Sequence, residues 1–334
     1  MPTFDLAAQR IGVPFSPARS PHAAVLDANL TAWLNETSVV GDGAVARRVR
    51  AACFSDLIAS VYPQAGCSEL NLIGRLIVWM FVYDDHFDPH RLGLAPDRAH
   101  QAADQLARVL RSSGSPGSHE PLWHALDELW HQGFREVDPL LRERLADHLL
   151  VFARGVALEV SMRVDQKVPL LDAYIDLRLD TFAWLVLVDL IEVAEGIAVP
   201  QCIRNTDTYA DLIRTTGRMM FLINDLYSLN KEIAAGETHN IVFVLQRKYG
   251  NELSEAFAKA VDLFRNDVVR FVELRTRLER MSLSQGERIA ASRHVRALEH
   301  IVRGELDWCR ESARYRTGPE SGAANLDLEE RPML

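Results

Sequence analysis

The sequence has few cysteines and no long apolar segment. Cys53, Cys67, Cys202 and Cys309 show neither metal-ligand spacing nor a secreted disulfide framework, so we interpret them as free thiols in a reducing cytoplasm. The longest apolar run, Leu76–Tyr83, is far too short to span a bilayer. Met1–Pro14 lacks the basic-then-apolar pattern of a signal peptide. These absences predict a cytoplasmic chain without stable membrane insertion.

The chain also has fewer basic than acidic residues. The formal net charge of −9 argues against nucleic acid or an anionic membrane surface as a partner. With 334 residues, 48% hydrophobic and 25% charged, the chain can bury a sizeable core. An anionic substrate would therefore be held by local positive charge and metal ions.

Persistent strand alternation is missing, and helical periodicity dominates, which predicts an all-α bundle. Three of the expected helices begin at a proline, which suits the first helical position. The tail 317–334, rich in Gly, Pro and acidic residues, is expected to be disordered beyond a single domain spanning 1–316. The expected helices are Ala44–Val61, Ser68–His86, Pro96–Arg111, Pro121–Gly133, Pro139–Arg163, Leu170–Ala194, Thr206–Ile233, Asn251–Met281 and Gln285–Tyr315.

One expected helix carries a line of oxygen ligands. Asn224, Ser228 and Glu232 are four residues apart, so each turns only about 40° from the last and all three share one face. An amide oxygen, a hydroxyl and a carboxylate in one line suit Mg²⁺. Lys231 adds a positive charge beside them.

A second oxygen cluster lies upstream, in the run Asp84-Asp85-His86-Phe87-Asp88. Asp84 and Asp88 are again four residues apart, whereas His86 lies off that face and is not expected to be a ligand. In isolation such a run is often a solvated helix end. Two oxygen clusters on separate helices instead favour a metal-bridged anionic substrate, and a diphosphate is the natural candidate.

The two motifs together resemble those of the bacterial class I terpene synthases. The resemblance runs from about residue 50 to residue 316. It implies a helical bundle around a deep central cavity. It also implies three Mg²⁺ ions, held by Asp84, Asp88, Asn224, Ser228 and Glu232. Lys231 agrees with the bacterial form of the second motif. The implied partner is an isoprenyl diphosphate.

The resemblance also assigns diphosphate contacts. Arg178 lies where the family has its diphosphate-sensing arginine, although it could instead pair with Asp176 or Asp180 on the surface. Arg314-Tyr315 resembles the pair that closes over the diphosphate. Glu159 and Arg163 match a helix position that the family uses near its metal site.

The sequence departs from the family just after Arg178. The family usually breaks its helix there at a small residue, often glycine, whose carbonyl points into the cavity. Thr181 fits the linker position, but Phe182 stands where the small residue is expected. Either the Phe182 carbonyl is presented despite the bulky side chain, or the break is shifted towards Ala183.

Three aromatic residues are candidates for the cavity wall. Phe81 precedes Asp84 by three residues, Phe221 precedes Asn224 by three, and Trp308 precedes Tyr315 by seven, each on the same helix face. Aromatic faces can stabilise a desolvated cation by roughly 1–2 kcal/mol each and offer no nucleophile. The alternative for each is an ordinary place in the packing core.

The resemblance implies a lyase that ionises an acyclic isoprenyl diphosphate, cyclises the carbocation and releases diphosphate. Farnesyl diphosphate is the expected substrate and geranylgeranyl diphosphate the next. The chain could instead be a chain-elongating prenyltransferase or a catalytically silent helical binding protein. The sequence does not decide the product or whether water is captured. It also leaves the oligomeric state open, with a homodimer as one alternative.

Overall fold

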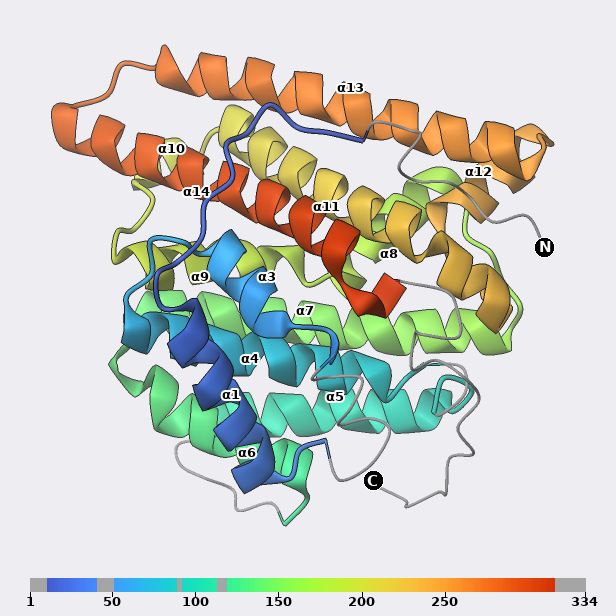
Figure 1. Cartoon of the computed structure of the whole chain (residues 1–334), viewed down its shortest axis with the longest axis horizontal. Coiled ribbons are helices and arrows are strands. Elements are labelled where there is room, and N and C mark those ends of the chain that lie inside the picture. The colour runs from blue at the N-terminus through green and yellow to red at the C-terminus, as the bar shows by residue number, and fades with distance from the viewer. Residues whose placement is uncertain (1–10, 41–50, 89–91, 113–118, 316–334) are drawn as a thin grey trace.

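The computed structural model describes residues 11–40, 51–88, 92–112 and 119–315, and the described residues form helices and no strand (Figure 1). The all-α prediction is therefore confirmed. The expected tail and the first part of the expected helix Ala44–Val61 lie outside the described residues. No helix among the described residues is both long and apolar enough to cross a membrane.

The long helices cross one another in layers, with α13 along one edge and α1 and α6 at the other (Figure 1). Helix α11 packs against α13 and α14, α5 packs against α7, and α14 packs against α3. The elements are α1 (Ala23–Thr37), α3 (Phe54–Val61), α4 (Cys67–Asp85), α5 (Pro96–Arg111), α6 (Pro121–His131), η2 (Gly133–Glu136), α7 (Pro139–Val164), α8 (Leu171–Thr181), α9 (Trp184–Glu195), α10 (Gln201–Arg204), α11 (Asp207–Ala235), α12 (Ile241–Tyr249), α13 (Leu253–Glu279), α14 (Gln285–Glu311) and η3 (Ala313–Tyr315).

Local sequence explains where the main helices begin and end. The Asp138 carboxylate caps α7 by accepting from two backbone amides, and the Thr206 hydroxyl caps α11. Helix α11 ends at Gly236, whose φ of 72° is the left-handed conformation that glycine adopts without strain. Ser284 and Glu287 form a capping box that starts α14.

Some expected helix boundaries were wrong. The expected helix Leu170–Ala194 is two helices, α8 and α9, separated at Phe182-Ala183. Helix α14 ends at Glu311, so Tyr315 belongs to the short turn η3 rather than to the helix of Trp308. Helices α1, α10 and α12 were not expected, because each is short or carries a weak apolar pattern that tertiary packing completes.

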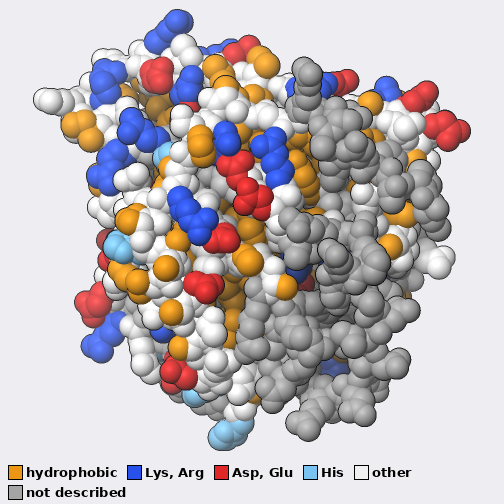
Figure 2. Space-filling view, in the orientation of Figure 1, with side chains coloured by type: hydrophobic (Ala, Val, Ile, Leu, Met, Phe, Trp, Pro, Cys, Tyr) orange, Lys and Arg blue, Asp and Glu red, His pale blue; other side chains and the backbone are white. Residues whose placement is uncertain are grey.

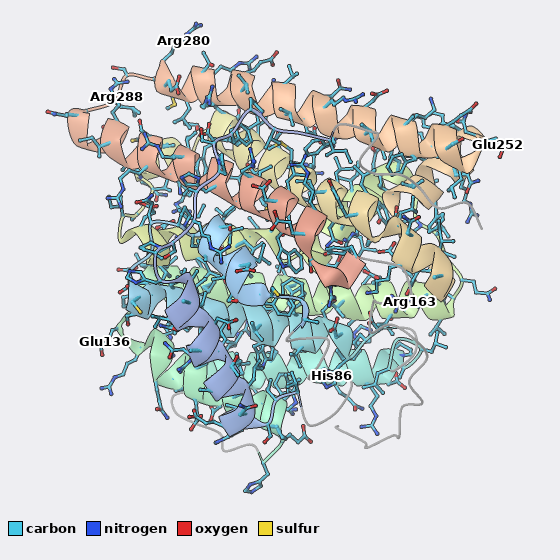
Figure 3. The ribbon with its side chains drawn as sticks, in the orientation of Figure 1. His86, Glu136, Arg163, Glu252, Arg280 and Arg288 are labelled. Carbon is cyan, nitrogen blue, oxygen red and sulfur yellow. The ribbon has the colours of Figure 1, made fainter. Side chains whose placement is uncertain are left out.

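The C-terminal ends of α4, α7 and α11 lie towards the same end of the molecule, at the right of Figure 1. His86 and Arg163 both project into this region in Figure 3. On the face shown in Figure 2, acidic and basic side chains are interspersed among the described residues. The charged residues at the right-hand end of Figure 1 are described next.

Candidate active site

The aspartate-rich run lies at the end of α4. The Tyr83 ring packs on Trp79 and Phe87 at 5.3 Å each and on Phe152 of α7 at 5.6 Å, which anchors this end. Helix α4 stops at Asp85, so Asp88 stands on the following turn. The expectation that Phe81, Asp84 and Asp88 share one helix face is therefore wrong for Asp88.

The Asp84 and Asp88 carboxylates accept no hydrogen bond from a described residue and are only half-buried. Burial, followed by the neighbouring Asp88, Asp85 and Glu159 carboxylates, raises the pKa of Asp84 to about 7. Ionising a carboxylate in these surroundings is costly, and a bound cation would offset that cost. The end of α4 is thus a region of uncompensated negative charge.

The second cluster lies on α11, where Asn224, Ser228 and Glu232 share one helix as the spacing predicts. Asn240, at the start of α12, donates from Nδ2 to Glu232 Oε2 at 2.8 Å. Burial and the nearby Asp225 carboxylate raise the pKa of Glu232, while hydrogen bonds from Ser228 and Asn240 lower it in part. The glutamate oxygens are therefore held in place next to the serine hydroxyl.

Asp225 is the organising residue that the sequence did not reveal. Its buried carboxylate accepts from Arg178 at 2.8 and 3.0 Å, from the Tyr174 hydroxyl at 2.6 Å and from the Ile241 amide at 2.9 Å. It thus joins α8, α11 and α12. Its only sequence signal is its place beside Asn224, about 100° round the helix and so on the face that meets α8.

Arg178 faces the α11 cluster rather than the surface. Besides Asp225, it donates to Thr181 Oγ1 at 3.0 Å and to Asn224 Oδ1 at 3.2 Å. Burial lowers its pKa, but Asp225, Tyr174 and Glu159 raise it more, so it stays a cation. Asp176, the surface alternative, pairs with Arg214 instead.

The break between α8 and α9 falls at Phe182-Ala183, where Ala183 adopts a left-handed φ of 52°. No described residue donates a hydrogen bond to the Phe182 carbonyl. The Phe182 ring lies against the Arg178 guanidinium, with Cζ 5.9 Å from the ring centroid. The left-handed residue at the break is thus Ala183, and the part of the Phe182 carbonyl in catalysis stays a prediction.

Glycines on the facing helices make room for this break. A Cβ on Gly155 of α7 would lie 2.9 Å from Asp180 Cβ and 3.3 Å from the Thr181 nitrogen. A Cβ on Gly217 of α11 would lie 2.7 Å from Leu179 Cδ2. The 2.9 and 2.7 Å contacts are shorter than real Cβ atoms show, so small residues are needed on the two helices that face the last turn of α8.

The Arg314-Tyr315 pair joins the two oxygen clusters. Arg314 Nη2 donates to Asp85 Oδ1 at 2.8 Å, and Asn224 Nδ2 donates to the Tyr315 hydroxyl at 2.9 Å. Burial lowers the pKa of Arg314, but Asp85 and Tyr315 raise it more. The short turn η3 therefore lies across both motifs.

Aromatic rings line the layer beneath this pair. Phe81 and Trp308 pack on each other at 6.1 Å and on Phe54 at 4.4 and 5.8 Å. The Tyr315 ring meets Trp308 edge-on at 5.5 Å, and the Arg314 guanidinium lies over Phe81. Phe221 and Trp308 are both buried in the hydrophobic core, whereas Phe81 is half-buried. The wall assignment of all three candidates stays a prediction.

Arg163 ties the loops behind the two clusters together (Figure 3). Its Nη1 donates to the Phe87 and Gly93 carbonyls at 3.2 and 3.1 Å, and its Nη2 donates to Glu159 at 2.9 Å. Its Nε lies 3.6 Å from Glu237, just past the end of α11. Lys231 is half-buried and forms no ion pair with a described residue, so its role stays a prediction.

The donor set fits a divalent metal. Around Asp84 and Glu232, carboxylates outnumber the arginines that could balance them, as the raised pKa values reflect. Among the described residues, no three His, Cys, Asp or Glu side chains could hold an ion by themselves. Such an ion would therefore also need the Asn224 and Ser228 oxygens and oxygens from the substrate.

Comparison with known proteins agrees with this geometry. Residues 75–270 match the family described as terpene synthase family 2, C-terminal metal binding. The chain is 29% identical over 309 residues to pentalenene synthase from Streptomyces avermitilis, covering 91% of each chain. It is 28% identical over 308 residues to (+)-T-muurolol synthase ((2E,6E)-farnesyl diphosphate cyclizing) from Roseiflexus castenholzii, covering 92% of this chain and 93% of the relative.

The crystal structure of germacradien-4-ol synthase from Streptomyces citricolor superposes with a TM-score of 0.77, covering 90% of this chain and 97% of that one. The two sequences are 24% identical, so this likeness bears on the fold alone.

Proposed function

The chain belongs to terpene synthase family 2 and is a terpene synthase, and on that premise we propose that it cyclises farnesyl diphosphate with Mg²⁺. The observation that carries the proposal is the bridge formed by η3. Arg314 reaches the α4 cluster, while Tyr315 and Arg178 reach the α11 cluster through Asn224. Cationic and hydrogen-bond donors between two sets of metal-binding oxygens suit a diphosphate.

The family resemblance implies three Mg²⁺ ions. The residues that would hold them are Asp84, Asp88, Asn224, Ser228 and Glu232. The metal supplies positive charge that stabilises the departing diphosphate.

The chain's own residues carry the other parts of the mechanism. Arg178, fixed by Asp225, and Arg314 donate hydrogen bonds to diphosphate oxygens, and Lys231 adds positive charge. The Phe182 carbonyl, to which no described residue donates a hydrogen bond, directs a partial negative charge at the developing cation. Beneath the rim, Phe81 and Trp308 keep water away from that cation and stabilise it with their faces. The expected sequence is ionisation, ring closure and proton loss.

Farnesyl diphosphate is favoured over geranylgeranyl diphosphate because the muurolol synthase relative is named for cyclising it. A chain-elongating prenyltransferase is the weaker alternative. That reaction normally goes with a second aspartate-rich motif, whereas α11 presents an amide, a hydroxyl and a carboxylate.

The test is to incubate the purified protein with geranyl, farnesyl or geranylgeranyl diphosphate and MgCl₂. The organic extract is analysed by gas chromatography–mass spectrometry, with EDTA as the metal-free control. We expect a cyclic C15 product only with farnesyl diphosphate and Mg²⁺. Consumption of isopentenyl diphosphate would instead favour the prenyltransferase, and a cyclic C20 product the diterpene cyclase.

A further inference from the structure

A buried carboxylate lies beneath the bridge and has no part in the roles assigned above. Glu305 is on α14, three residues before Trp308 and four before Cys309, so the three side chains project from the same side of the helix. Its side chain is only 4% exposed. The group therefore lies inside the bundle, next to the aromatic layer.

Glu305 differs from the other buried carboxylates in its partners. Asp189, Glu192, Asp225 and Asp267 each pair with an arginine, and Asp127 lies 3.5 Å from a ring nitrogen of His131. Glu305 accepts only the Cys309 thiol, at 3.3 Å, and no described residue donates to its second oxygen, Oε2. Burying an ionisable group without a strong partner is costly, so a purely structural role explains Glu305 poorly.

Polar groups connect this carboxylate to the rim of the site. The Cys309 thiol donates to Glu305 Oε1 at 3.3 Å and has the Tyr315 side chain as a neighbour, which lowers the pKa of the thiol in part. The Tyr315 hydroxyl in turn accepts from Asn224 at 2.9 Å. Burial raises the pKa of Glu305 to about 7, with the Cys309 hydrogen bond and the Arg314 charge opposing the rise. A group with such a pKa can both accept and release a proton near neutral pH.

Building on the proposed cyclisation, we propose that Glu305 is the catalytic base that ends the reaction by taking a proton from the last carbocation. A C–H bond next to the cationic carbon breaks, its electron pair becomes the new carbon–carbon double bond, and the proton moves to Oε2. The resulting carboxylic acid turns its O–H towards the Cys309 sulfur and passes its proton through the Cys309 and Tyr315 groups to the rim. There the proton leaves with the diphosphate, which restores the carboxylate.

The test uses the full-length protein with farnesyl diphosphate and MgCl₂, and compares Glu305→Gln with Glu299→Gln, the same change on the same helix. Glu305→Gln keeps the shape and the oxygen that accepts from Cys309 but cannot take up the proton. We expect its share of the parent product to fall about tenfold or more, while diphosphate release stays within about threefold of wild type. Glu299→Gln removes a carboxylate that pairs with Arg275 instead of facing the aromatic layer, and it should keep the parent product dominant.

An unchanged product mixture in a folded Glu305→Gln variant overturns the proposal. If the glutamine variant does not fold by circular dichroism, Glu305→Asp decides instead. The aspartate is one methylene shorter, so it should change the proportions of double-bond isomers, and an unchanged mixture again refutes the role. Failure of the wild type to cyclise farnesyl diphosphate would instead count against the proposed function, which separates the two hypotheses.

Discussion

Helix α7 carries charged residues near both of its ends. The two ends differ in whether the carboxylates around them are paired with cationic side chains. Near its C-terminus, Glu159 and Arg163 lie beside a region of unbalanced carboxylates. Near its start, about 22 Å away along the helix axis, lies a second group that we call the distal cluster. It consists of Arg144, His148, Asp189, Glu192 and Arg204.

In the distal cluster every buried carboxylate has a partner. Arg144 donates to Asp189 and Glu192 at 2.7 Å each, and His148 lies 2.6 Å from the second oxygen of Asp189. Arg204 adds a further contact to Glu192. These pairs join α7, α9 and α10 and leave no obvious place for a ligand.

The contrast shows which feature marks a functional site in this bundle. Both ends hold buried charge, but only at the α4–α11 end do carboxylates such as Asp84 lack donors and have a raised pKa. Paired charge holds helices together, whereas unpaired charge of one sign is a cost that a bound cation can offset.

The strongest test of this contrast removes one negative oxygen from the α4–α11 end. For Asp84→Asn or Glu232→Gln we expect diphosphate release to fall about a thousandfold, equivalent to about 4 kcal/mol of barrier, because an amide is a far poorer Mg²⁺ ligand. The free energy of unfolding should not fall. Near-normal release by either variant at saturating Mg²⁺ would defeat the assignment of metal ligands.

The matching change at the other end should have the opposite signature. Asp189→Asn takes one of two carboxylate partners from Arg144 and the carboxylate partner from His148, so we expect the free energy of unfolding to fall by about 3–5 kcal/mol. Turnover per folded molecule should change by less than about threefold. Urea denaturation and an assay corrected for the folded fraction separate these effects. A selective loss of activity would mean that the distal cluster belongs to the site.

A smaller effect is expected within the aromatic layer. Phe81→Ala or Trp308→Ala removes one ring face, so an earlier cation should lose its proton and the product mixture should change more than the rate of diphosphate release. Phe264→Ala on α13 is the control, because this ring is fully buried and is no candidate for the cavity wall, so its removal should mainly lower stability. Unchanged product ratios in both test variants would assign Phe81 and Trp308 to the core.

The smallest effect concerns acid stability near the distal cluster. Burial, with Arg204 and Arg144 nearby, lowers the pKa of His294 from 6.5 to about 3. Between these values the unfolded chain binds the proton that the folded chain excludes, so this contribution to stability is complete above pH 6.5 and is lost as the pH falls towards 3. His294→Gln should make the fall in melting temperature from pH 7 to 4 less steep. The exposed His124→Gln should leave it unchanged, and equal slopes for wild type and His294→Gln would contradict the prediction.

The α11 cluster could be predicted because its geometry is local. A spacing of four residues inside a long helix fixes a shared face whatever surrounds it. The same reasoning failed for Asp88, because α4 ends at Asp85 and the spacing rule holds only inside a helix. It failed for Trp308 and Tyr315 for the same reason, yet the two rings still meet through the turn η3.

Residues that act through partners distant in sequence could not be predicted in this way. Asp225 contacts Arg178, Tyr174 and Ile241 only because α8, α11 and α12 pack together. Glu305 reads in the sequence as one more polar residue on an amphipathic helix, and its burial depends on the elements that cover α14. Such roles depend on tertiary packing, which spacing along one chain segment does not encode.

At the Phe182-Ala183 break, the small residues lie on the neighbouring helices and not in the segment that bends. The segment bends without a glycine of its own because Gly155 and Gly217 leave space on the two helices that flank it. Tolerance to substitution should follow the same pattern, with the larger penalty at Gly155, where a side chain would meet backbone atoms, than at Phe182 itself. Comparing relatives at this break therefore requires three positions to be considered together, since the residue that bends and the residues that permit the bend lie on separate helices.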